Sequence, residues 1–196
     1  MTQTATQPQT QTQPQTRPQS EPSSLPLRLH HHAWVTDDQE VNRRFYEDVI
    51  GLPLVATWTE REVLSGAERA YSHTLYGLAD GSALAFFQFA DPKDQEEFKT
   101  DINVTPLRHI AFKVEAETQE AIRERIAAAG APEANAHVLD HGYCVSLYVT
   151  DPNGLILEFV VDHPDVEKID AERRTTAHAD LARWVAGDHT SNNDWR

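Results

Sequence analysis

Polar and apolar residues alternate from Leu29 to Thr36, and this period of two predicts a β-strand. A helical period follows, from Asp37 or Asp38 to Gly51, a residue typical of helix ends. One side of this helix carries the apolar residues Val41, Phe45 and Val49. Further apolar runs predict three strands, Leu54–Trp58, Tyr71–Leu78 and Ala83–Phe89. The Asp80-Gly81 turn predicts a hairpin between the last two strands.

A polar connector, residues 91–105, with room for one helical turn, separates this half from a second half with the same order of elements. The second half begins with a predicted strand, Leu107–Val114, and a helix, Thr118–Ala129, that ends at Gly130. Three strands follow: one around Val138, then Tyr143–Thr150 and Leu155–Val161, the last after an Asp151–Gly154 turn.

The two halves align with each other at nearly constant spacing. His31 precedes His109 by 78 positions, Gly51 precedes Gly130 by 79, and the turn glycines Gly81 and Gly154 are 73 apart. Such internal repetition indicates a duplicated structural unit. The sequence therefore predicts an α+β fold built from paired βαβββ modules.

The domain organisation follows from shifts in composition. Residues 1–24 are almost wholly Thr, Gln, Pro and Ser, and we expect a disordered tail because this segment has little apolar surface to bury. Residues 25–163 form the predicted domain, with halves of about 27–90 and 107–163. Residues 164–196 are a predicted helical extension, with a helix over Ala171–Val185 and a tail after Gly187.

Charge and composition exclude several classes of function. The chain has 17 Lys and Arg against 31 Asp and Glu, a net charge of −14, which argues against nucleic-acid binding. No apolar run approaches the ~20 residues of a membrane span, and no secretory signal is evident. A single cysteine, Cys144, excludes an intrachain disulfide. We expect a cytoplasmic protein, away from membranes, that acts on a small molecule.

Three residues stand out on the strand faces. His31 and His109 occupy matching first strands, and Glu158 lies on the last strand with Ile156 and Val160. One inward histidine is commonly an ordinary core or cavity residue. A buried glutamate, however, requires a partner or a cation. Two imidazoles and one carboxylate form the ligand set of non-haem Fe(II) oxygenases, so the sequence predicts a metal site at His31, His109 and Glu158.

Short motifs in both halves carry a resemblance to a known family. The first half contains His31-His32-Ala33, Asp38 and the run Phe45–Leu52. The second half contains Arg108–Phe112, His141-Gly142, Ser146–Tyr148, Asp151–Gly154 and Leu157–Phe159. Through these motifs, over about residues 27–163, the chain resembles the vicinal oxygen chelate superfamily. This superfamily includes glyoxalase I, extradiol catechol dioxygenases, fosfomycin-resistance enzymes and bleomycin-binding proteins.

The resemblance implies a curled, mostly antiparallel sheet around a metal cleft, and metal-ligand roles for His31, His109 and Glu158. A glyoxalase-type site has a fourth ligand on the last strand of the first half, where the offset of 73 places Ala85. Alanine cannot bind a metal, which favours the three-ligand arrangement of extradiol dioxygenases. A shifted alignment would make Gln88 a weak fourth ligand.

Three further residues are candidate catalytic groups. By resemblance, Tyr148 corresponds to the extradiol tyrosine that hydrogen-bonds a metal-bound substrate oxygen, with an ordinary strand tyrosine as the alternative. His141 resembles the histidine that moves protons, although it lies two residues closer to the tyrosine than in the family pattern. His73, on a middle strand, is either a second acid–base group or a surface-facing residue.

The sequence thus predicts an Fe(II)-dependent dioxygenase that binds O₂ and a small catechol-like or other bidentate oxygen substrate. Mn, Ni and Zn are alternative metals, and a glyoxalase-type isomerase, lyase or thiol transferase is the alternative enzyme. A protein that binds a drug or metabolite without catalysis is the third hypothesis. We expect a homodimer, with Ala171–Val185 as a candidate contact, and a metal cleft within one chain or between two.

Overall fold

The computed structural model describes residues 26–99, 105, 107–130 and 136–196. The predicted disordered tail, residues 1–24, lies outside this part of the chain. The first half contains one strand, a continuous helical segment and three more strands. They are β1 (His31–Val35), α1 (Gln39–Arg43), η1 (Arg44–Ile50), β2 (Leu54–Leu64), β3 (Ala67–Gly77) and β4 (Ala83–Phe89).

The helical segment begins and ends where the sequence predicts. The Asp38 carboxylate accepts hydrogen bonds from the backbone N–H groups of Glu40 and Val41, at 2.8 and 3.0 Å, and so caps the first turn. Gly51, with φ of 91°, ends the segment in the left-handed region. The second part, η1, is a π-helix, which the sequence did not indicate.

The connector carries a short helix, α2 (Pro92–Phe98), and the second half repeats the order of the first. Its elements are β5 (His109–Lys113), α3 (Ala116–Ala128), β6 (Ala136–Asp140), β7 (Cys144–Thr150) and β8 (Ile156–Asp162). The β3–β4 and β7–β8 turns contain Gly81 and Gly154, with φ of 79° and 85°. Both turns therefore lie where the sequence predicts them.

Each half forms a four-stranded mixed sheet, in the order β1-β4-β3-β2 and β5-β8-β7-β6. The first strand of each half is parallel to the last, and the remaining pairs are antiparallel. Ala33 lies opposite Ala85, and Ala111 lies opposite Glu158. Since Ala33 and Ala111 are equivalent in the repeat, Ala85 is the structural counterpart of Glu158.

One face of each sheet packs against the helices and forms the core. In the second sheet Leu147, Leu157 and Phe159 face α3, and in the first sheet Leu84 and Phe86 face the helical segment. The remaining core residues include Tyr46, Ile50, Tyr76, Ile122 and Ile126. Because side chains alternate along a strand, the residues between these core positions lie on the opposite face, which we call the inner face.

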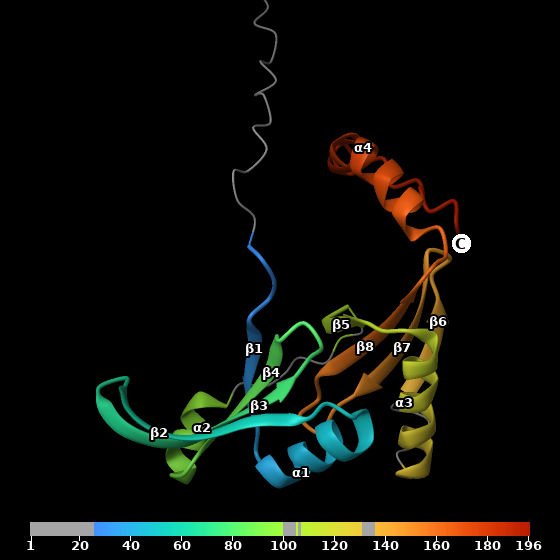
Figure 1. The fold of residues 1–196 in the computed structure, drawn as a ribbon. Helices are drawn as coiled ribbons and strands as arrows, with labels where there is room; N and C mark the ends of the chain where they lie inside the picture. Colours follow the sequence, from blue (N-terminus) through green and yellow to red (C-terminus); the bar gives the residue numbers. More distant parts are fainter. Residues whose placement is uncertain (1–25, 100–104, 106, 131–135) are drawn as a thin grey trace, which may run out of the picture.

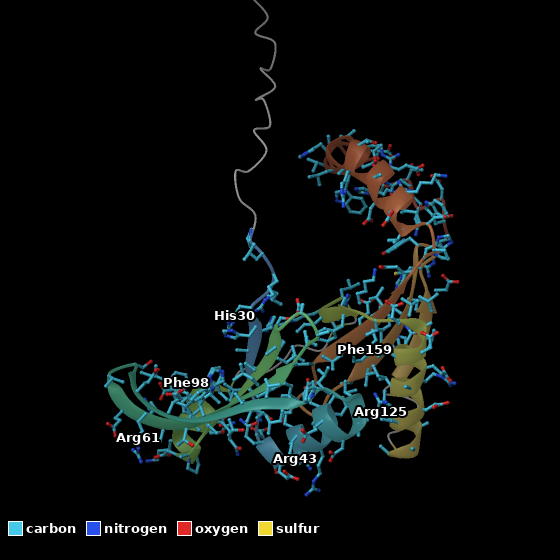
Figure 2. The ribbon with its side chains drawn as sticks, in the orientation of Figure 1. His30, Arg43, Arg61, Phe98, Arg125 and Phe159 are labelled. Atoms are coloured by element: carbon cyan, nitrogen blue, oxygen red, sulfur yellow. The ribbon has the colours of Figure 1, made fainter. Side chains whose placement is uncertain are left out.

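The two halves are joined by polar contacts as well as by the core. The Tyr46 hydroxyl donates to Asp151 at 2.7 Å, and Asn153 donates to Asn42 at 2.8 Å. The Arg125 guanidinium donates to the carbonyls of Val49 and Ile50, both at 2.7 Å. Figure 2 shows Arg125 where α3 meets the helical segment of the first half. These contacts fix the relative position of the modules.

The last helix, α4 (Val166–Val185), follows β8 and begins five residues before the predicted Ala171. Ile169 is buried at its base, whereas Leu181, Trp184 and Val185 are exposed. Figure 1 shows α4 beyond the end of the second sheet, with the two sheets arranged as separate arms that do not close on each other. None of the described helices is long and apolar enough to cross a membrane.

Candidate metal centre

A polar cluster lies on the inner face of the second sheet. His109 is on the edge strand β5, Glu158 on β8 and Tyr148 on β7. Glu158 and Tyr148 are directly opposite each other in the antiparallel pair. On the other side of β8, His109 lies opposite Ile156, two residues before Glu158. Alternation with the core residues Leu147, Leu157 and Phe159 places these polar side chains on one face.

Glu158 is the centre of this cluster and only 6% of it is exposed. One carboxylate oxygen, Oε2, lies 2.8 Å from His109 Nε2. The other, Oε1, accepts the Tyr148 hydroxyl at 2.8 Å, and His141 Nε2 lies 3.0 Å from that hydroxyl. The buried carboxylate therefore has a partner on each oxygen, as a buried charge requires.

The hydrogen-bond directions follow from the number of protons. The Tyr148 hydroxyl has one proton and donates it to Glu158, so His141 donates Nε2–H to the Tyr148 oxygen. His109 likewise presents Nε2–H to the Glu158 carboxylate, which only accepts when ionised. Burial, and then the bond to Glu158, raises the pKa of Tyr148 to about 12.

His31 and His73 lie on the first sheet instead. Their ring centroids are 6.4 Å apart, and His31 Nδ1 is 2.8 Å from His30 Nδ1. His73 stacks on Phe87 at 4.2 Å, and its Nε2 is a buried atom that has no hydrogen-bond partner among the described residues. Burial of the ring lowers the pKa of His73, and the nearby His31 imidazole lowers it further by charge repulsion. His73 is thus a partly enclosed neighbour of His31 and is not an outward-facing strand residue.

The structure brings His109, Glu158, Tyr148 and His141 into one chain of contacts, but it does not bring His31 into that chain. Within the described residues, no three His, Cys, Asp or Glu side chains are grouped so that they could hold a metal ion. An imidazole nitrogen and a carboxylate oxygen side by side are suitable donors for a divalent first-row ion. The described part of one polypeptide therefore presents two suitable donors without a third beside them.

Strand register shows which residue of the first half corresponds to Glu158. Ala85, fully buried, is the counterpart of Glu158 and offers no donor atom. Gln88 uses both ends of its amide at the start of α1. Its Nε2 donates to the Asp37 carbonyl at 2.8 Å, and its Oε1 accepts from the Gln39 backbone N–H at 3.1 Å. Gln88 also has the strand parity of the core-facing Phe86, so it lies on the face opposite Ala85.

Sequence analysis missed His137 as a member of this cluster. His137 lies opposite Tyr148 in the β6–β7 pair, and the two rings stack with centroids 5.0 Å apart. The only signal was its place next to Val138 in a short strand whose register the sequence did not fix. Ser146 and Cys144 continue the same face of β7, with Sγ and Oγ 3.8 Å apart.

Comparison with solved structures shows what the chain is similar to. A glyoxylase/bleomycin resistance protein/dioxygenase domain from Frankia sp. EAN1pec is 16% identical with a TM-score of 0.52, covering 72% of this chain and 95% of that one. The fosfomycin resistance protein FosX of Listeria monocytogenes, in complex with Mn(II) and sulfate, is 15% identical with a TM-score of 0.50, covering 73% and 98%. At these identities the likeness concerns the fold.

The family is assigned by a match to a family model rather than by an individual relative. Comparison with curated protein sequences yields no match. The family model described as Glyoxalase/Bleomycin resistance protein/Dioxygenase superfamily matches residues 28–159, which cover both βαβββ modules up to the middle of β8 and include all the residues of the polar cluster. The chain belongs to the Glyoxalase/Bleomycin resistance protein/Dioxygenase superfamily.

Proposed function

We propose that this protein is a metal-dependent enzyme that acts on a small substrate through two neighbouring oxygen atoms. The observation that carries the proposal is the buried Glu158 carboxylate, held between an imidazole of the neighbouring strand and the hydroxyl of Tyr148. His109 and Glu158 are the proposed ligands from this module. FosX, which shares the fold, was solved with Mn(II), and this supports a divalent ion here.

We infer that His31 of a second copy completes the ligand set. Among the described residues of one chain, His31 is not grouped with His109 and Glu158. β1 and β5 are edge strands, and Ala33 and Ala111 on their inner faces are exposed. An unpaired, exposed edge of this kind favours association with another sheet. A homodimer that joins the first module of one chain to the second module of the other would supply the missing imidazole.

For the reaction, we propose a dioxygenase of the Fe(II) extradiol type that uses O₂ and a catechol-like substrate. A bound cation would act as a Lewis acid that lowers the pKa of the substrate hydroxyls and orients the reactants. In this proposal a cation bound at Glu158 would free the Tyr148 hydroxyl, which now donates to that carboxylate, to hydrogen-bond a substrate oxygen, and His141, 3.0 Å from the hydroxyl, would exchange a proton with it. The absence of a donor at Ala85 supports three protein ligands over four.

The glyoxalase-type alternative, a redox-silent lyase or transferase, is favoured by one observation, the Mn(II) in the FosX structure. Metal analysis after anaerobic purification, followed by oxygen uptake with catechol, separates the two. Iron near one atom per chain and catechol-dependent oxygen consumption support the dioxygenase. Metal without oxygen consumption supports the alternative. A protein that retains no metal and binds small molecules equally well with chelator present would contradict both.

Substitutions test the ligands one at a time. His109→Ala and Glu158→Gln are expected to lose the metal while the fold, measured by circular dichroism, is kept. His31→Ala is expected to lose it as well. His32→Ala is the matched control, because His32 is on the same strand but stacks on Trp34 at 3.7 Å, on the opposite face. Metal retained in all three ligand variants would remove the proposed site.

A further inference from the structure

The segment Asn193–Arg196 lies outside the family match and returns to the polar cluster. The Asn193 side-chain amide donates to the His141 carbonyl at 3.1 Å. The Trp195 ring packs on His163, with centroids 5.2 Å apart. Asn193 and Trp195 are half-buried, whereas the residues on either side of them are exposed. The segment is therefore docked on the second module, although the sequence predicted only a tail there.

The segment contacts the turn at Gly142, where the absence of a side chain leaves room for it. A Cβ built on Gly142 would overlap the Trp195 carbonyl and would lie 2.7 Å from the backbone nitrogen of Arg196. Gly142 also has a φ of 84°, and its N–H donates to the Asp140 carboxylate at 2.7 Å. Only a glycine permits this close approach of two backbones. Gly142 is thus the contact point for the segment.

This turn positions the proton-carrying residue of the cluster. His141 directly precedes Gly142, and its backbone N–H donates to the Cys144 carbonyl at 2.9 Å. Its imidazole is the outermost member of the chain of contacts that continues through Tyr148 to Glu158. Asn193 therefore holds the backbone carbonyl of His141, and the ring of His141 contacts Tyr148.

We propose that Asn193 and Trp195 are positioning residues, which hold the His141–Gly142 turn so that the His141 ring stays hydrogen-bonded to Tyr148. The catalytic consequence rests on the proposed function, because only there does His141 exchange protons for substrate. Whatever the reaction, the tautomer and orientation of the His141 imidazole depend on a segment more than fifty residues away in the sequence.

Two substitutions displace the segment in different ways. Gly142→Ala introduces the overlapping methyl group, and Gly66→Ala is its matched control. Gly66 has nearly the same φ, 83°, but nothing lies within 4 Å of its Cβ position, so the control carries the backbone strain without the collision. Asn193→Asp removes the donor to the His141 carbonyl and keeps the oxygen that accepts the Trp195 backbone N–H at 3.2 Å. Asn192→Asp, at an exposed neighbour, controls for the added charge.

The readout is the imidazole of His141 in metal-free, full-length protein, followed by long-range proton–nitrogen NMR and assigned with His141→Gln. The wild type is expected to show the Nε2–H tautomer that the bond to Tyr148 requires. Gly142→Ala and Asn193→Asp are expected to show averaging between the two tautomers. Amide exchange at His141 and His163, whose N–H groups donate to the Cys144 and Tyr143 carbonyls, should become about fivefold faster, the factor for one lost neutral hydrogen bond. Gly66→Ala and Asn192→Asp should match the wild type.

The outcome does not depend on metal binding or turnover. A His141 signal that is the same in wild type, Gly142→Ala and Asn193→Asp overturns the proposal, even if the protein binds Mn(II) fully. Loss of the Nε2–H tautomer in both variants supports it, even if no metal binds and the proposed function fails. Trp195→Phe should restore most of the wild-type signal that Trp195→Ala loses, because the phenyl ring can still pack on His163. Equal spectra for these two variants would count against a role for the ring.

Discussion

Arg125 is the side chain whose removal we expect to loosen the junction between the modules. Its guanidinium reaches from α3 to the end of η1 and donates to the Val49 and Ile50 carbonyls, both at 2.7 Å. These carbonyls belong to a helix end, where cations are favoured. Gly51 leaves the space for this approach, since a Cβ there would lie 3.0 Å from Arg125 Nη2.

The size of the effect follows from these two bonds. A hydrogen bond from a charged donor stabilises a protein by about 1.5–3 kcal/mol, and the lower value applies because Arg125 is only half-buried. Arg125→Met, which keeps much of the aliphatic packing, should therefore lower the free energy of unfolding by about 2–3 kcal/mol. With a slope of about 2 kcal/mol per molar urea, the midpoint should fall by about 1–1.5 M.

Urea unfolding followed by circular dichroism measures this change. Arg123→Met is the control, because Arg123 lies on the same helix and forms an exposed ion pair with Glu120, so its loss should cost less than about 0.5 kcal/mol. If Arg125→Met and Arg123→Met unfold at the same urea concentration, the two carbonyl contacts do not hold the modules together and the reasoning is refuted.

Three other predictions concern polar side chains of the core and of the candidate site. Tyr46→Phe should cost about 1–3 kcal/mol at pH 7, measured by urea unfolding, because Asp151 loses a buried donor. Burial raises the pKa of Asp151, so the folded state favours the protonated carboxyl. The stability gained from this protonation is present at acid pH and is lost as the pH rises through the raised pKa. Since Tyr46 favours the ionised form, the cost should shrink on acidification, and an equal cost at pH 3 and 7 would contradict this. Binding of Zn(II), a diamagnetic ion, should leave the His109 ring in its Nδ1–H tautomer, because the metal takes Nε2, which presents its proton to Glu158 in the metal-free protein, and long-range proton–nitrogen NMR should report this change. Gln88→Ala should leave metal stoichiometry unchanged, and a lost metal would restore the four-ligand hypothesis.

Much of the fold was predictable because local signals coincide with the repeat. Asp38 and Gly51 mark the ends of the first helical segment through a cap and a left-handed residue, and both are visible in the sequence. The β2–β3 hairpin was less visible. β2 continues to Leu64 and β3 begins at Ala67, and the residues near this turn are mostly polar and do not alternate with apolar ones. A long two-stranded ribbon of this kind has little core to face, so the sequence pattern is weak there.

The candidate site was predicted only in part, because local sequence patterns fix the face of a strand but not the distance between two sheets. Strand parity predicted an inward face for His109 and Glu158, whereas Tyr148 was a candidate through the family resemblance, and the strand register places all three on one face. Whether His31 meets them depends on how two sheets approach each other, and no local pattern encodes that distance. Its role as a ligand therefore remains a prediction. Val41 shows the limit of periodicity, because it has the spacing of Phe45 and Val49 yet is exposed.

The central claim is that two imidazoles and one carboxylate bind a single cation, with His31 and His109 as the imidazoles. X-ray absorption spectroscopy at the metal edge of the loaded protein measures this directly, because coordinated imidazole rings give a characteristic multiple-scattering signal. We predict two imidazoles per metal in the wild type and no more than one in any metal retained by His31→Ala or His109→Ala. A loaded wild-type protein without imidazole scattering, or variants with the wild-type spectrum, would contradict the account.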